Sequence, residues 1–255
     1  MEPTPSPAPT TARPVTWTWV DVLLIGATSV GVVSAGSLGL GLLLRLSRAG
    51  QTGPARITLP ISLGMVALEA LALVGSVYLL GLRRRRLPWA AVGLRPAGAG
   101  WLVGAGAIGL ACVPLTGLVA TLVQLLLGRP LEENSQAAVL APEGFSWLGA
   151  IGMLLLTGVA VPFAEELFFR GTLYTWLRQR WGVTVGTVVS TLVFGLVHVE
   201  PAVVAAGLVL GLIQAIVYER SRSLWTVVLI HAVNNSAKVV LLYGMLALGL
   251  ATAAP

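Results

Sequence analysis

Residues 162–171 read Pro-Phe-Ala-Glu-Glu-Leu-Phe-Phe-Arg-Gly and place three ionisable side chains, Glu165, Glu166 and Arg170, in an otherwise apolar region. A charged group at membrane depth costs about 2.5–3.5 kcal/mol on insertion scales, so such groups normally have partners and a function. In a helix, Glu166 and Arg170 lie four residues apart on one face and can form an ion pair. Glu165 points about 100° away from Glu166, so the same arginine does not readily neutralise it. The stretch therefore predicts one structural glutamate, Glu166, and one available glutamate, Glu165.

The composition around this stretch is that of a membrane protein. Of the 255 residues, 56% are hydrophobic and only 10% are charged, whereas about 25% are charged in a typical soluble domain. The apolar runs are as long as membrane-spanning helices. We expect an all-α, polytopic membrane protein with about seven transmembrane helices, near residues 19–44, 57–82, 101–127, 147–169, 184–200, 202–218 and 225–248. Residues 1–16, rich in Pro, Thr and Ala, are expected to be a disordered tail.

The net charge of +6 comes from arginines between the apolar runs. With a cytoplasmic N-terminus, most of them fall on the cytoplasmic side: Arg13, Arg83, Arg84, Arg85, Arg86, Arg95, Arg170, Arg178, Arg180, Arg220 and Arg222, against Arg45, Arg48, Arg56 and Arg129 opposite. Positive charge gathers in cytoplasmic loops, which predicts a multi-pass plasma-membrane protein with its N-terminus inside and its C-terminus outside. Lipid is then a partner, and nucleic acid is not, because no basic surface interleaved with aromatic residues is present. The oligomeric state is left open.

The chain contains two histidines, His198 and His231, and both lie in apolar runs. Glu165 stands 17 positions before Gly182 and His198 stands 16 positions after it. If the chain reverses at Gly182, both residues lie about 25 Å from the same hairpin end. His231 lies two spans after His198, in the expected span 225–248. Asn235, four residues after His231, shares its helical face, and Asn234 is the near alternative. The sequence thus predicts one shared site.

These residue types suit the hydrolysis of an amide bond. Apolar surroundings disfavour the charged form of a carboxyl group, so a buried glutamate can act as general base and then as general acid near neutral pH. A histidine opposite can hold and polarise a water, and His and Asn donors can stabilise an oxyanion. The alternative is a zinc site with Glu165, His198 and His231 as ligands and an open fourth position. The single cysteine, Cys112, excludes a cysteine metal cluster.

Three motifs follow one another on successive hydrophobic segments: Glu165-Glu166-x-x-x-Arg170, Phe194-x-x-x-His198 and His231-x-x-x-Asn235. Together they resemble the CAAX protease and bacteriocin-processing (CPBP, or Abi) family of intramembrane endopeptidases, which includes the Ras-converting enzyme. The resemblance covers about residues 147–240. It implies N-terminal transmembrane helices over 17–146 and a catalytic transmembrane core over 147–250.

The resemblance also implies a role for each residue. Glu165 would be the catalytic base, and His198 would help to activate the water. His231 and Asn235 would form the oxyanion site. Glu166 and Arg170 would hold the architecture, with Phe194 as structural support. Members of the family have been described both as metalloproteases and as metal-independent glutamate proteases, and the metal-independent mechanism, with no cofactor, is favoured here over zinc.

Two functions follow from these observations. The leading one is an intramembrane endopeptidase that hydrolyses a peptide bond of a membrane-associated protein or peptide. The alternative is a non-enzymatic immunity or regulatory protein that binds and sequesters a peptide or membrane partner in the same polar cavity. A transporter fits less well, because no inverted repeat is visible. Glu69, in the second span, is interpreted as part of a local hydrogen-bonded pair, with a functional role as the alternative.

Overall fold

The computed structural model describes residues 17–47, 57–129 and 135–251, and all of their regular structure is helical. The expected disordered tail, residues 1–16, lies outside this description. The long helices are α1 (Trp19–Ser47), α2 (Leu59–Ser76) with its continuation η1 (Val77–Arg83), α3 (Ala99–Leu126), α8 (Pro201–Ser221) and α9 (Leu224–Ala247). Between α3 and α8 one helical segment is built from α5 (Trp147–Leu155), η3 (Leu156–Ala160), α6 (Val161–Phe168), η4 (Phe169–Tyr174) and α7 (Thr175–Leu196). Two short helices, η2 (Trp89–Val92) and α4 (Ser135–Leu140), complete the described set.

Six of the described helices are long and apolar enough to cross a membrane, and one of them, Trp147–Leu196, is 50 residues long. This segment turns back at Gly182, whose φ of 85° and ψ of 177° are not helical. A side chain at Gly186 would come within 3.2 Å of the backbone of Arg178, so the two arms pack directly against each other. The segment therefore supplies two of seven spans. The prediction of an all-α, polytopic membrane protein with about seven transmembrane helices is confirmed.

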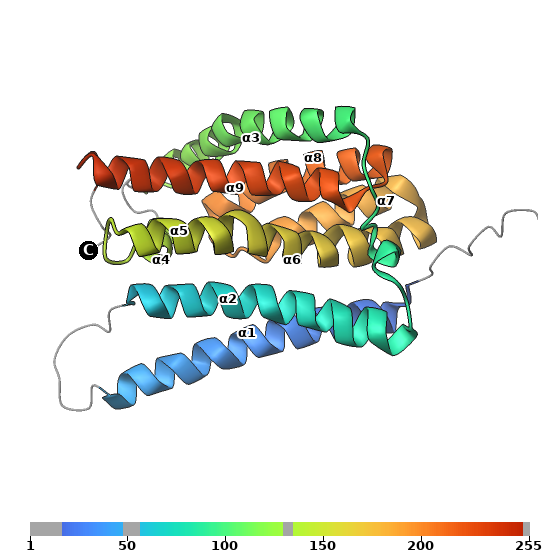
Figure 1. Ribbon diagram of the computed structural model, residues 1–255, viewed down its shortest axis with the longest axis horizontal. Coiled ribbons are helices and arrows are strands. Elements are labelled where there is room, and N and C mark those ends of the chain that lie inside the picture. Colours follow the sequence, from blue (N-terminus) through green and yellow to red (C-terminus); the bar gives the residue numbers. More distant parts are fainter. Residues whose placement is uncertain (1–16, 48–56, 130–134, 252–255) are drawn as a thin grey trace, which may run out of the picture.

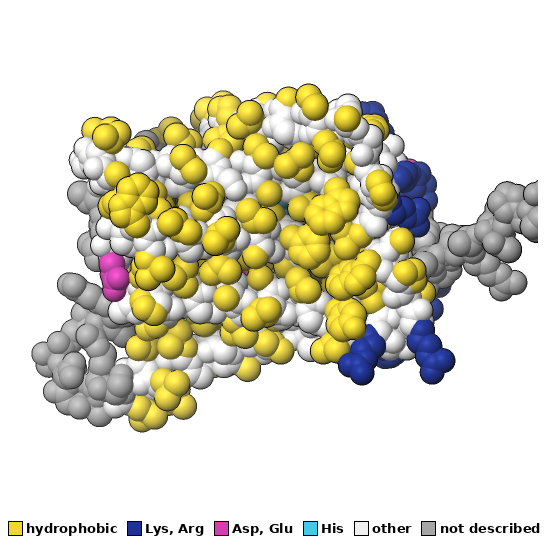
Figure 2. Space-filling model, viewed as in Figure 1, with side chains coloured by type: hydrophobic (Ala, Val, Ile, Leu, Met, Phe, Trp, Pro, Cys, Tyr) yellow, Lys and Arg dark blue, Asp and Glu magenta, His cyan; other side chains and the backbone are white. Residues whose placement is uncertain are grey.

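The helices run side by side along the long axis of the molecule (Figure 1). Helix α2 packs on α1 and α6, α6 also packs on α9, and α9 packs on α3, so α6 lies between α2 and α9. The lateral face shown in Figure 2 is covered with hydrophobic side chains, and the Lys and Arg side chains visible there gather at one end of the molecule. This distribution is that of a bundle that presents its sides to lipid and its ends to water.

The helix that carries the two glutamates passes through Pro162 without a break. Proline has no N–H and cannot donate to the carbonyl four residues earlier, which is that of Gly158. Ser236 of α9 supplies the missing donor, with Oγ 3.2 Å from the Gly158 oxygen. The neighbouring Thr157 oxygen, in the π-helical turn η3, accepts from Asn235 Nδ2 at 3.3 Å. Side chains of α9 therefore satisfy the carbonyls that this irregular turn leaves open, and they fix α9 against the glutamate-bearing helix.

Two glycines of α8 face the long helical segment at different distances. A Cβ at Gly207 would meet Gly195, His198 and Phe194 at 3.4–3.9 Å, which is ordinary contact. A Cβ at Gly211 would lie 2.9 Å from the Phe194 ring, closer than carbon atoms normally approach. The Gly207-x-x-x-Gly211 pattern is thus a packing motif in which the second glycine is the more constrained.

We expect Gly211→Ala to destabilise the protein and Gly207→Ala to leave its stability unchanged or to raise it slightly. The alanine at 211 must displace the Phe194 ring, and overpacking of this kind costs about 1–3 kcal/mol. Alanine gains about 1 kcal/mol in helix propensity at either position, which favours the Gly207 variant. Thermal unfolding of both variants in the same detergent checks this pair. Equal midpoints would contradict the proposed close approach at Gly211.

Candidate active site

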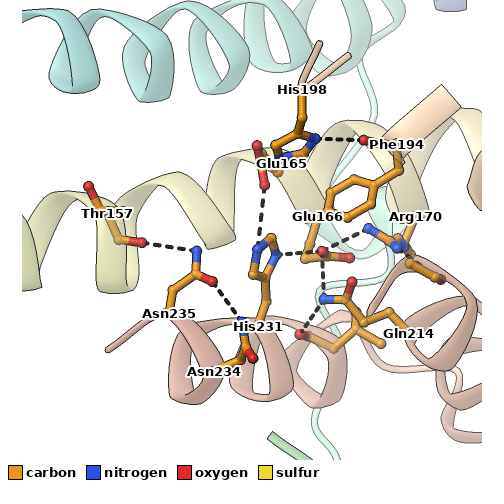
Figure 3. Close-up of polar contacts among 12 residues, drawn as sticks. Thr157, Glu165, Glu166, Arg170, Phe194, His198, Gln214, His231, Asn234 and Asn235 are labelled. Carbon is orange, nitrogen blue, oxygen red and sulfur yellow. Dashed lines mark hydrogen bonds and ion pairs between the residues drawn. The ribbon is translucent and has the colours of Figure 1, made fainter. Parts of the chain in front are cut away.

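Glu166 is fully buried and accepts three hydrogen bonds on a single oxygen (Figure 3). Arg170 Nη1 donates to Glu166 Oε1 at 2.8 Å, Gln214 Nε2 donates at 2.9 Å, and His231 Nδ1 lies 2.9 Å away. The i,i+4 ion pair expected between Glu166 and Arg170 is therefore present, and it is buried on both sides. The partners come from η4, α8 and α9, so this one carboxylate connects three other elements to α6.

Arg170 is fixed at both ends of its guanidinium group. Nη2 donates to the backbone oxygen of Gly211 at 3.1 Å, and the guanidinium carbon lies 4.5 Å from the centroid of the Phe194 ring. Aromatic faces attract cations, so this stacking adds to the ion pair with Glu166. Arg170 therefore contacts α6, α7 and α8 at once, as a residue that holds the architecture should.

His231 lies between the two neighbouring glutamates. Glu166 Oε1 already accepts from Arg170 and Gln214, so we assign the hydrogen of this contact to His231 Nδ1. The other ring nitrogen, Nε2, then carries a lone pair and lies 3.6 Å from Glu165 Oε2. This distance is too long for a hydrogen bond and too short for an intervening water. A small rotation of either side chain would bring the two atoms within hydrogen-bond distance, at which a proton held by Glu165 could pass to His231 Nε2.

Glu165 itself is 6% exposed and lies on the part of α6 that packs against α2. Ala164, directly before it, and Val161 form a buried cluster with Ala70 of α2. The two adjacent glutamates thus differ in their surroundings, because the roughly 100° between successive helical residues turns Glu165 away from the three donors of Glu166.

His198 stands at the end of α7 and is only partly buried. Its Nδ1 lies 2.9 Å from the Phe194 backbone oxygen, and a carbonyl oxygen only accepts, so Nδ1 is the protonated nitrogen and Nε2 is the acceptor. The Phe194 ring is in edge contact with both imidazoles, with centroids 5.3 Å from His198 and 5.7 Å from His231. Phe194 therefore fixes the relative position of the two histidines.

Asn235 lies one turn beyond His231 and has backbone and side-chain partners. Its Nδ2 donates to the Thr157 oxygen, and its Oδ1 accepts from Asn234 Nδ2 at 3.0 Å. Asn234 is buried and accepts from Thr116 Oγ1 of α3 at 3.3 Å. The shared face expected for His231 and Asn235 is thus present, but one amide hydrogen of Asn235 is committed to the π-helical turn η3.

Sequence reasoning missed Gln214. This glutamine is fully buried in α8, and its Nε2 also lies 3.4 Å from the Val227 oxygen of α9. A signal was available, because Gln214 is the only amide side chain in the apolar run 201–218. A polar group at that depth requires a partner in the same way as a charged one.

A zinc site would require Glu165, His198 and His231 to lie close enough together to bind one ion. Across the described residues, no three His, Cys, Asp or Glu side chains are grouped so that they could hold a metal ion. The three residues therefore do not form a ligand set in this arrangement. The Nδ1 contacts of both imidazoles do not decide the question, because they leave each Nε2 atom with a lone pair.

We expect Arg170→Ala to destabilise the protein far more than Glu165→Ala. Loss of Arg170 leaves Glu166 as a buried, uncompensated charge, and breaking a buried pair costs about 3–5 kcal/mol. Glu165 loses only the 3.6 Å approach to His231. Thermal unfolding in detergent measures both variants, with exposed Arg180→Ala as the matched arginine control. Similar midpoints for the Arg170 and Glu165 variants would contradict this division of roles.

Comparison with known proteins places this site within a recognised segment. Residues 147–237 match the family model described as type II CAAX prenyl endopeptidase Rce1-like, and they contain every predicted site residue from Glu165 to Asn235. The curated protein named "Putative membrane peptidase YdiL", from Bacillus subtilis (strain 168), is 22% identical over 89 residues, which cover 35% of this chain and 36% of that protein. No solved structure matches. Residues 147–237 of this multi-pass membrane protein are therefore similar to the type II CAAX prenyl endopeptidase Rce1-like family.

Proposed function

We propose that this protein is an intramembrane endopeptidase that cleaves a peptide bond of a membrane-associated protein or peptide, with Glu165 as the general base. The observation that carries the proposal is a buried carboxylate facing His231 Nε2 at 3.6 Å, while the other nitrogen of that ring is held by Glu166. The match of residues 147–237 to a peptidase family supports the same class of reaction.

In the first step, Glu165 takes a proton from a water as the water oxygen forms a bond to the substrate carbonyl carbon. The carbonyl oxygen becomes an oxyanion. In the second step, the intermediate collapses, the bond between carbon and nitrogen breaks, and protonated Glu165 returns the proton to the leaving amine. General acid–base catalysis of this kind contributes about 10²–10⁴-fold to a rate.

The other residues assist this transfer. His198 can accept a hydrogen bond from the attacking water at Nε2, because its Nδ1–H is directed to the Phe194 oxygen. When the proton that Glu165 collects moves to His231 Nε2, the imidazolium can donate a hydrogen bond to the oxyanion while Glu166 stabilises its charge, and the proton returns to Glu165 before the leaving amine takes it. The second amide hydrogen of Asn235 completes the oxyanion site.

We expect Glu165→Gln to lower the cleavage rate by about 10²–10⁴-fold, because the amide cannot take the proton from water. The measurement is cleavage of a membrane-embedded peptide by the purified protein in liposomes, with thermal unfolding to verify folding. Glu143→Gln is the matched control, since Glu143 is an exposed residue in a turn outside the site. A folded Glu165→Gln variant with wild-type activity would eliminate Glu165 as the base.

The same assay separates the glutamate mechanism from the two alternatives. Because the proposed steps use only side chains and water, treatment of the wild type with a metal chelator should leave cleavage intact. Loss of activity that zinc restores would instead assign Glu165, His198 and His231 as ligands. A wild type that binds peptide without cleaving it, and a Glu165→Gln variant that binds equally well, would favour the sequestering function.

We also infer that the end of the bundle at which α1 begins faces the cytoplasm. Asp21, in the first turn of α1, forms ion pairs with Arg84 and Arg85 at the end of η1, and Figure 2 shows the visible Lys and Arg side chains at one end of the molecule. Basic groups are retained on the cytoplasmic side, which supports this orientation.

Cysteine labelling tests the orientation. In a Cys112→Ala background, Arg95→Cys should resist a membrane-impermeant maleimide in intact cells, and Glu143→Cys should react with it. Both residues are exposed; Arg95 precedes α3, and Glu143 lies after that span, in the turn between α4 and α5. The reverse labelling pattern would invert the topology.

A further inference from the structure

Glu69 is an ionisable residue in the middle of α2, outside the segment that matches the peptidase family. It follows Val66 by three positions and precedes Leu73 by four, and Ala70 stands directly after it. At these spacings the four residues share one helical face. This face packs against α6: Ala70 is buried together with Val161 and Ala164, and Val66 and Leu73 pack on the same cluster. The helix therefore presents Glu69 towards the part of α6 that carries Glu165.

The electrostatic neighbours of Glu69 are the residues of the candidate site. Glu69 lies within electrostatic range of His198, in the turn that follows α7, and of Glu165 of α6. Glu69 is partly exposed, whereas Glu165 is almost fully buried, so Glu69 lies at the edge of the site. The arginine of the site, Arg170, is bound to Glu166. His198 is therefore the group that can pair with Glu69.

A local partner on α2 is not available. The residues three and four positions from Glu69 are Met65, Val66, Ala72 and Leu73, and none of them has a side chain that can donate a hydrogen bond to a carboxylate. A hydrogen-bonding partner for Glu69 must therefore come from another segment, and the interpretation of Glu69 as part of a local hydrogen-bonded pair stays a prediction. A carboxylate at membrane depth requires a compensating group, and His198, in the turn after α7, can serve as one.

The geometry of His198 defines what Glu69 can do. Because Nδ1 is directed to the Phe194 oxygen, only Nε2 can face another partner. A carboxylate and a nitrogen lone pair repel each other unless a hydrogen lies between them. That hydrogen comes either from a water that shares one of its hydrogens between both groups and keeps the other for Glu165, or from a second proton on His198. In both cases the carboxylate determines where a hydrogen is held beside Glu165.

We propose that Glu69 is a positioning residue of the active site, whose carboxylate orients His198 and the water that His198 holds for Glu165. This inference rests on the proposed peptidase function and deepens it. The site then has two Glu–His pairs, Glu166 with His231 and Glu69 with His198, and the second pair joins α2 to the family segment. The N-terminal helices thereby supply part of the catalytic geometry.

Kinetics of Glu69 variants test the proposal on the wild-type enzyme's own substrate. We expect Glu69→Gln to lower kcat by 10- to 100-fold, with KM within about threefold of wild type, and Glu69→Asp to recover more activity than Glu69→Ala. Lys238→Gln is the matched control, because Lys238 is another half-buried charge, whose electrostatic neighbour is Cys112. Wild-type kcat in Glu69→Gln, or no advantage of Asp over Ala, would overturn the proposal.

A second measurement does not depend on activity. The chain has only two histidines, so protein labelled with ¹⁵N-histidine gives ring signals from His198 and His231 alone. Glu69→Gln should shift the ring nitrogens of His198 and leave those of His231 in place, and single His→Gln variants assign the signals. Unchanged His198 signals would overturn the pairing. A shift of His198 in a protein that cleaves nothing would retain the pairing and reject the peptidase function.

Discussion

The site depends on one carboxylate oxygen, Glu166 Oε1, and the three donors that surround it. A fully buried charge in a membrane protein has no water to solvate it, so protein groups must supply every compensating contact. Arg170, Gln214 and His231 supply three such contacts, all to Oε1, from three separate elements. The same contacts set the tautomer of His231 and hold Arg170 over Phe194. The geometry of the candidate catalytic residues is thus a consequence of how Glu166 is compensated.

The neighbouring glutamate is freed by the same arrangement. Because successive helical residues differ by about 100°, the donors that gather on Glu166 are not aimed at Glu165. Glu165 faces one imidazole nitrogen and the α2 side of the bundle. One residue of the pair is therefore immobilised, and the other remains able to gain and lose a proton, although they are adjacent in the chain.

Much of this could be predicted from the sequence, and the reasons are specific. The length of the apolar runs predicts the spans, the i,i+4 spacing predicts the Glu166–Arg170 pair, and Gly182 marks the reversal of the chain. The contacts of Gln214 with Glu166 and of Asn235 with Thr157 could not be predicted. Both depend on how helices rotate against each other, which hydropathy does not encode. The π-helical turns η3 and η4 could not be predicted either, because the sequence argument places residues along a helix with 3.6 residues per turn throughout.

The contacts at Pro162 also limit how the bundle can move. Asn235 and Ser236 of α9 hold two consecutive carbonyls, those of Thr157 and Gly158, on the opposite helix. A slide of α9 by one residue is a translation of about 1.5 Å and a rotation of about 100°, and it would break both bonds together. Sliding is therefore opposed, whereas a tilt about these two bonds leaves them intact. The two bonds lie little more than one turn beyond His231, so a tilt of α9 about them moves its far ends most and leaves the distance between the two helices at the histidine nearly constant.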